Sequence, residues 1–216
     1  MDVRLYLIKF YSIHVIVVII TLACFLMNGP MRGGLPLDNT VAERIAFIAD
    51  NGLIWSLSWF TWMLSAIGLF VFCAILADEL TQNFLRMIGI ALVGMGIAPD
   101  LIAEVIYAFV IPEIIGRQLD SNAVEILEII AMHLTGYLGN GLYNLGGLLL
   151  TILAINQGVL KSWIAAWGVT AWILGLMLSL FVAMGSVKAA EIFTAIAMVL
   201  STAWMLIFAH KVLSVE

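Results

Sequence analysis

The chain has 216 residues, of which 64% are hydrophobic and 11% charged, and its formal net charge is −5. Its mean hydropathy of +1.14 lies far above that of a soluble globular domain. A soluble core of this size cannot bury so much apolar surface, whereas a bilayer covers it on every helix, so we expect lipid as the main partner. The acidic balance and the lack of a basic stripe argue against binding to nucleic acid.

Six apolar runs are long enough to cross the hydrocarbon layer, which takes about 20 residues in a helix. Turn-forming Gly, Pro, Asn and Asp residues separate the runs, which lie near 10–29, 53–77, 86–111, 124–156, 162–184 and 187–210. We therefore predict an all-α, polytopic integral membrane protein, a bundle of about six transmembrane helices in a single domain over residues 1–216. No motif is specific enough to name a family.

The first connection between the runs contains a short helix, which we expect to lie at the membrane surface over residues 39–51. Thr40 and Glu43 match a capping box, and Val41, Ile45 and Ile48 form one apolar stripe. A segment that docks on the bundle is the simpler interpretation, and a functional lid is the alternative.

Lys and Arg divide almost evenly between the two sides of the predicted bundle. With the N-terminus inside, five of them fall on the cytoplasmic side and four on the other. This majority favours cytoplasmic termini, and we expect the cytoplasmic membrane of a bacterium or archaeon.

Two acidic residues lie deep in the third apolar run. Asp100, Glu104 and Tyr107 are spaced by four and three positions, so their side chains share one helical face. An ionisable group at this depth costs several kcal/mol unless it is paired or hydrated. Such residues are functional candidates by default.

The fourth run contains a second polar face. His133, Tyr137, Asn140 and Asn144 follow one another at offsets of four, three and four. A helical rise of about 1.5 Å per residue brings this stripe level with the acids of the third run. We expect the two stripes to face each other and to form a buried polar site between the third and fourth helices.

No Lys or Arg lies deep in any run to neutralise the acids. Either the carboxyls are protonated in a polar network that only specifies packing, or they bind a proton or cation. Trp59 and Trp62 are deep enough to add cation–π contacts to a small cationic solute, although core packing is the simpler role. Trp55 and Trp163 are expected to be interfacial anchors. We predict a proton- or cation-linked transporter of unknown solute.

Two other functions are compatible with the sequence. In an integral membrane enzyme, Asp100, Glu104 and His133 would be metal ligands or the general acid and base. In an accessory or scaffold subunit, the polar faces would hold the bundle together while its outer surface contacts a second copy or a membrane complex.

A haem is a separate hypothesis, because His14 and His210 lie near the cytoplasmic ends of their runs and are expected at a similar depth. Interfacial histidines without a cofactor are the more common case, and we leave the cofactor open.

Overall fold

The computed structural model describes residues 3–37, 39–118 and 120–213. Six helices in this part of the chain are long and apolar enough to cross a membrane, which confirms the predicted fold. Four of them are α1 (Val3–Asn28), α3 (Gly52–Asp78), α8 (Ser162–Ala183) and α9 (Val187–Lys211). The third span joins α4 (Phe84–Val105), η2 (Ile106–Val110) and α5 (Ile111–Gly116). The fourth joins α6 (Ser121–Met132), η3 (His133–Gly139) and α7 (Asn140–Asn156).

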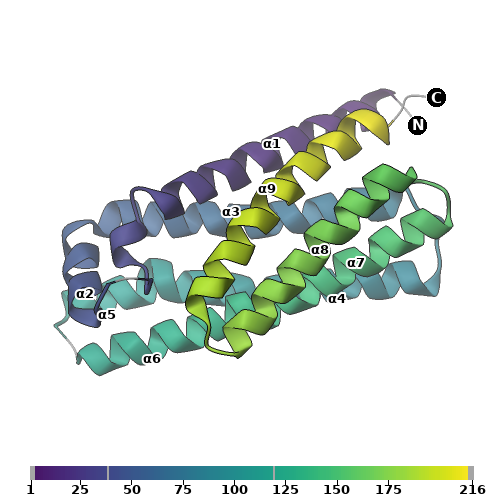
Figure 1. Cartoon of the computed structure of the whole chain (residues 1–216). Coiled ribbons are helices and arrows are strands. Elements are labelled where there is room, and N and C mark those ends of the chain that lie inside the picture. Colours follow the sequence, from purple (N-terminus) through teal and green to yellow (C-terminus); the bar gives the residue numbers. More distant parts are fainter. Residues whose placement is uncertain (1–2, 38, 119, 214–216) are drawn as a thin grey trace.

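The spans form a ring in chain order. The first packs on α3, α3 on α4, α4 on α7 and η3, α7 on α8, and α8 on α9, and contacts between α9 and α1 close the ring. The two ends of the chain lie at the same end of the bundle, here called the terminal end (Figure 1). The opposite end carries the short helix α2 (Val41–Asp50) and is called the α2 end.

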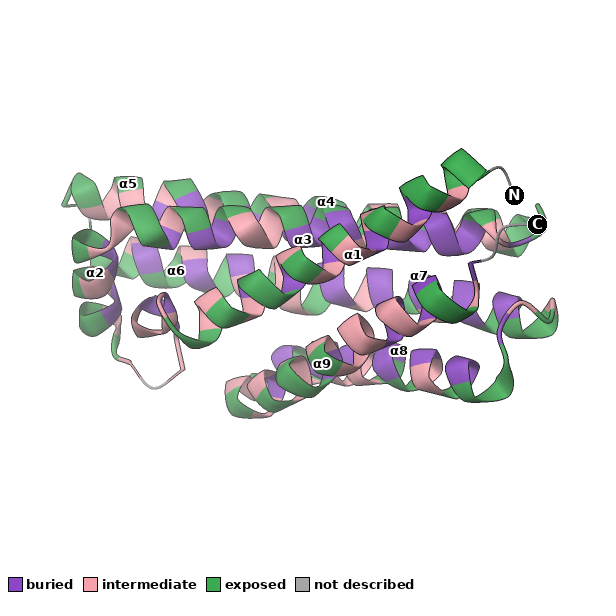
Figure 2. Ribbon diagram, turned by 90° about the horizontal axis from the view of Figure 1, so that it is seen from above, coloured by how far each residue is buried: buried purple, intermediate pink, exposed green. Residues whose placement is uncertain are grey.

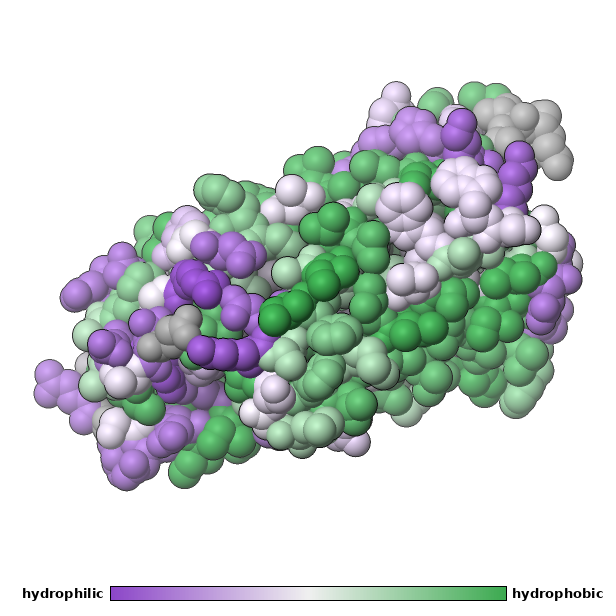
Figure 3. Space-filling view, in the orientation of Figure 1, coloured by the Kyte–Doolittle hydropathy of each residue, from purple (hydrophilic) through white to green (hydrophobic). Residues whose placement is uncertain are grey.

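On the face of the bundle shown in Figure 3, the surface is apolar between two hydrophilic ends. Large exposed side chains of the bundle include Val18, Phe25 and Val199. Buried residues gather on the sides of the helices that face their neighbours (Figure 2). A soluble protein seldom exposes an apolar patch of this extent, so the pattern fits a chain embedded in a lipid bilayer.

The short helix α2 lies crosswise at its end of the bundle (Figure 1). Its predicted capping box is present, with the Thr40 hydroxyl accepting from Glu43 N–H and the Glu43 carboxylate accepting from Thr40 N–H at 2.7 Å. The Glu43 carboxyl therefore has a pKa below its ordinary value, because the backbone N–H and the hydroxyl of Thr40 stabilise its charge. Ile48 is buried beneath the helix, so the apolar stripe docks on the bundle.

The third and fourth spans each contain a π-helical segment, η2 in the third and η3 in the fourth. In η2 the freed carbonyls find partners on α3: Trp55 Nε1 donates to Tyr107 O at 2.7 Å, and Ser56 Oγ donates to Ala108 O at 2.7 Å. Pro112 has no N–H for the carbonyl four residues earlier, which is that of Ala108. The π segment and the proline thus create acceptors that tie the third span to α3.

Glycines let α4 approach the fourth span closely. A Cβ added at Gly96 would lie 2.6 Å from Gly139 O, and one added at Gly146 would lie 2.6 Å from Gly89 O. No side chain fits at either crossing without moving the backbone. The acids of α4 are therefore held against η3 by backbone packing.

Candidate functional site

The two acids of α4 are buried where the helix packs against η3. Asp100 is 6% exposed and Glu104 is 2% exposed. Asp100 Oδ1 accepts a hydrogen bond from the Thr135 hydroxyl of η3. No Lys or Arg among the described residues forms an ion pair with either carboxyl. Glu104 Oε2 is buried without any hydrogen-bond partner.

An aromatic pair lies about one helical turn from Glu104, on the side of the α2 end. The rings of Trp59 and Tyr107 stack with centroids 4.2 Å apart and planes 7° apart. Because α3 and α4 are antiparallel, Trp62 lies level with Glu104, each being three residues from a member of the stacked pair. The structure therefore brings Asp100, Glu104, Tyr107, Trp59 and Trp62 to one region between α3, the third span and η3.

The tryptophans of this region differ from the others in their hydrogen bonding. Nε1 of four other tryptophans donates to a protein acceptor, at distances of 2.7 to 3.0 Å, in Trp55, Trp167, Trp172 and Trp204. Trp59 Nε1 and Trp62 Nε1 are buried with no acceptor. Buried indole N–H groups normally find a partner, so two unpaired donors at about the level of an unpaired carboxylate oxygen need an explanation.

Trp55, which was predicted to be an interfacial anchor, is 1% exposed and packed against Tyr107, so its ring faces the bundle and not the surroundings. The Trp55 indole N–H donates to Tyr107 O, and this hydrogen bond holds the ring inside the bundle. Trp163 is 52% exposed, as an interfacial anchor requires.

The asparagines of the fourth span turn away from the acids. Asn140 Nδ2 donates to Gly175 O at 2.7 Å and to Ser179 Oγ at 2.8 Å, both on α8. Asn144 Nδ2 donates to Asn140 O and Oδ1, at 2.7 and 2.9 Å. The Asn140 amide is satisfied by α8 and the Asn144 amide by Asn140, which is what a structural network requires.

His133 and Tyr137 are exposed on the outer surface, and His133 Nδ1 lies 2.9 Å from Ile129 O of its own helix. The stripe expected over His133, Tyr137, Asn140 and Asn144 is therefore split. Its spacing assumed 3.6 residues per turn, but a π-helix holds about one residue more in each turn, so η3 rotates the residues on either side of it apart. No group of three His, Cys, Asp or Glu residues in the described ranges could hold a metal ion. The geometry does not assemble the three-ligand metal site of the enzyme hypothesis.

A third buried acid, Glu128 of α6, was not singled out by sequence reasoning. Arg44 of α2 donates to both of its oxygens, with Nε–Oε1 3.0 Å and Nη2–Oε2 2.5 Å. Both side chains are nearly inaccessible, at 7% and 6% exposed. A signal existed, because Arg44 shares the apolar face of Val41 and Ile48, and a charge on such a face needs a partner. The spacing within one helix does not reveal which acid that partner is.

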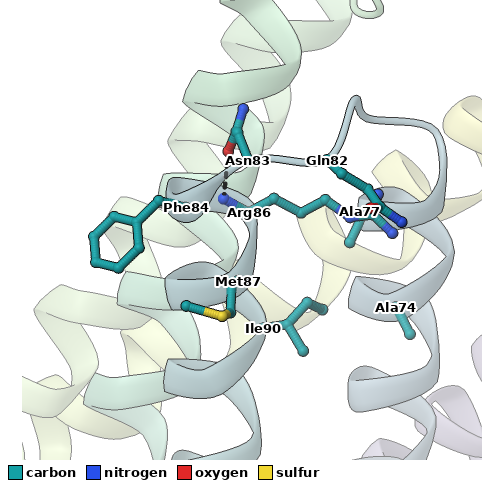
Figure 4. Close-up of a pocket in the computed structure, with 8 residues that line it drawn as sticks. All are labelled: Ala74, Ala77, Gln82, Asn83, Phe84, Arg86, Met87 and Ile90. Atoms are coloured by element: carbon teal, nitrogen blue, oxygen red, sulfur yellow. Dashed lines mark hydrogen bonds between the residues drawn. The ribbon is translucent and has the colours of Figure 1, made fainter.

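Two cavities open at opposite ends of the bundle. One of about 480 Å³ lies at the α2 end, beside Arg44 and Glu128. The other, of about 610 Å³, lies between the end of α3 and the start of α4, where Arg86 and Asn83 line it together with Met87 and Ile90 (Figure 4). Asp100 is about 21 Å further along α4 than Arg86, so this second cavity does not contain the acids.

Comparisons with known proteins do not assign the chain, since no protein family, curated protein or solved structure matches it. The function has to be argued from the site.

Proposed function

We propose that this chain is a small multi-pass carrier coupled to a proton or cation, with Asp100 and Glu104 as the ion-binding groups. The observation that carries the proposal is the set of buried polar atoms without partners, Glu104 Oε2, Trp59 Nε1 and Trp62 Nε1. A polar network that serves only to hold helices together is expected to satisfy its members, as Asn140 and Asn144 do. The Glu104 oxygen could hold a proton or a cation, whereas the two indole N–H groups could donate to water or to an acceptor group of a solute.

The chemistry of the acids fits reversible ion binding. Two ionised carboxyls one turn apart in a low-dielectric site would repel each other and lose hydration, so a proton or cation is bound in the resting state. Exchanging that ion between the two sides of the membrane provides the coupling step. The faces of Trp59 and Trp62 would add cation–π stabilisation for a small organic cation.

The orientation belongs to the same proposal, with both termini in the cytoplasm of a bacterium or archaeon. The α2 end, with the Arg44–Glu128 pair, would then face outward. The four polar residues of the fourth span are left out of the ion site. His133 and Tyr137 are exposed, Asn140 is bonded to α8, and Asn144 is bonded to Asn140. An accessory subunit, in a homo-oligomer or a membrane complex, is the competing proposal, and the satisfied asparagine network favours it.

Ion flux into liposomes tests the coupling. Protein is reconstituted with a pH-sensitive dye inside, and a proton or Na⁺ gradient is imposed. We expect wild-type protein to dissipate the gradient, and Asp100→Asn or Glu104→Gln to slow it by about tenfold or more, because neither amide can carry the ion. Glu113→Gln is the matched control, since Glu113 is an exposed acid of the same span. Equal flux in all variants would remove the acids from the mechanism.

A carrier that moves ions only together with its solute would show no flux in this assay, so ion binding is measured as well. Ion binding at Glu104 changes the electric field at Trp59 and Trp62, so tryptophan fluorescence is expected to titrate with pH or Na⁺. Glu104→Gln should abolish this titration, and Glu113→Gln should preserve it. A titration that survives in Glu104→Gln counts for the accessory-subunit proposal.

A further inference from the structure

Two of the three histidines meet at the terminal end of the bundle. His14 lies on α1 and His210 on α9, 196 positions apart, and their Nε2 atoms are 3.3 Å apart. The similar depth expected from the sequence is confirmed, and His210 is exposed on the surface while His14 is partly so. The proposed carrier site does not use either residue.

The surroundings determine which nitrogen atoms are available. His14 Nδ1 is 2.8 Å from Phe10 O, so it carries a proton and donates to that carbonyl. The Nε2 lone pair of neutral His14 then points at His210 Nε2. The Phe10 ring packs against both imidazoles, with centroids 4.4 Å from His14 and 4.9 Å from His210, and holds the two rings together.

We propose that His14 and His210 bind one divalent transition-metal ion of the Cu²⁺, Ni²⁺ and Zn²⁺ class through their Nε2 atoms. Two imidazoles on a tetrahedral ion, with metal–nitrogen bonds of about 2.0–2.1 Å, have nitrogens about 3.3–3.4 Å apart. The observed 3.3 Å between the two Nε2 atoms matches that edge, and a bound ion would replace the hydrogen bond between them after a small rotation of the rings. The Nδ1–H bond to Phe10 O is the outer contact that usually orients a metal-binding histidine.

The same distance argues against the haem hypothesis. Axial ligands on opposite sides of one iron require nitrogens about 4 Å apart, with the metal in line between them. At 3.3 Å the two nitrogens fit neighbouring positions on an ion. The described residues place no third His, Cys, Asp or Glu side chain close enough to be a ligand, so water would complete the shell. We expect Cu²⁺ to bind most tightly and Mg²⁺ not to bind.

The test is a calorimetric titration of Cu²⁺, Zn²⁺ and Mg²⁺ into purified protein that carries no polyhistidine tag. We expect one Cu²⁺ and one Zn²⁺ per chain, and His14→Gln or His210→Gln to weaken binding by about tenfold or more. Glutamine retains hydrogen-bonding groups, and the sites are partly exposed, so both variants should fold. His133→Gln is the matched control, since His133 is exposed and bonded within its own helix.

Thermal unfolding gives a second reading of the same site. An ion that bridges α1 and α9 raises the melting temperature of wild-type protein and of His133→Gln, but not of His14→Gln or His210→Gln. The proposal is overturned if neither Cu²⁺ nor Zn²⁺ binds, or if His133→Gln weakens binding as much as the paired variants. In that outcome the pair is a hydrogen bond between helices only.

Discussion

Buried carboxylates occur in two regions of this protein, and the two regions differ in the hydrogen-bond partners of those carboxylates. Glu128, at the α2 end, receives both hydrogen bonds of a bidentate arginine. Asp100 and Glu104, deeper in the bundle, receive one hydroxyl hydrogen bond and no cation within the described ranges. An ionised carboxyl that is paired in the fold can anchor a helix, whereas an unpaired one must exist with a proton or an ion. The first pair therefore anchors a helix, and the second region is where ion binding is proposed.

Removing one partner of the buried pair should give the largest effect on stability. Arg44→Met leaves the Glu128 charge buried without a partner, and we expect the free energy of unfolding in mixed micelles to fall by about 3–5 kcal/mol. Adding Glu128→Leu should restore most of that loss, because the double variant buries no charge.

Arg117→Ala is the matched control for this experiment. Arg117 pairs with Glu113, and both side chains are largely exposed, so its loss should cost about 0.5 kcal/mol or less. A similar small loss for Arg44→Met would show that α2 is not anchored by this pair.

Paired and unpaired indoles allow a smaller test of the binding region. Trp172 Nε1 donates to Thr151 Oγ1 at 2.8 Å, whereas Trp59 Nε1 has no acceptor. Trp172→Phe and Trp59→Phe remove the same atoms, and we expect the first to cost about 1 kcal/mol more in unfolding free energy, because it breaks a buried hydrogen bond. Equal losses would mean that the Trp59 N–H has a partner in the membrane.

Substitution of Asp100 and Glu104 should change the free energy of unfolding least. Asn and Gln at positions 100 and 104 cannot ionise, and no ion pair is lost, so Asp100→Asn/Glu104→Gln should keep the unfolding free energy within about 0.5 kcal/mol or raise it. A loss of about 2 kcal/mol or more would make the acids structural. Comparing this variant with Arg44→Met in the same micelles separates the two regions directly.

Much of the fold could be predicted because the signals are local. Apolar run length predicts six spanning helices, and the Thr40–Glu43 spacing predicts the start of α2. The acids at 100 and 104 were found because a charge inside an apolar run is visible without any partner. The depths of His14 and His210 were also readable, since rise per residue is constant along a helix.

The rotation of each helix about its axis and the partners of its polar side chains could not be predicted from the sequence in the same way. The prediction of one polar face on the fourth span was wrong at η3. A π segment changes the angle between successive side chains, and no residue type in the sequence predicts such a segment. The burial of Trp55 was not predicted, because the carbonyl of Tyr107 that accepts its N–H becomes available only in the folded third span. The Arg44–Glu128 pair joins residues 84 positions apart, and only the docking of α2 on α6 selects that partner.

The sequence by itself determined that this protein is a helical membrane bundle with two acids at depth, because hydropathy and helical rise are properties of single segments. The tertiary structure decided which polar groups meet. It paired Glu128 with Arg44 and Asn140 with α8, and it left Glu104 Oε2, Trp59 Nε1 and Trp62 Nε1 buried without hydrogen-bond partners. Those outcomes depend on how the helices rotate against one another, which packing between segments sets and no single segment encodes.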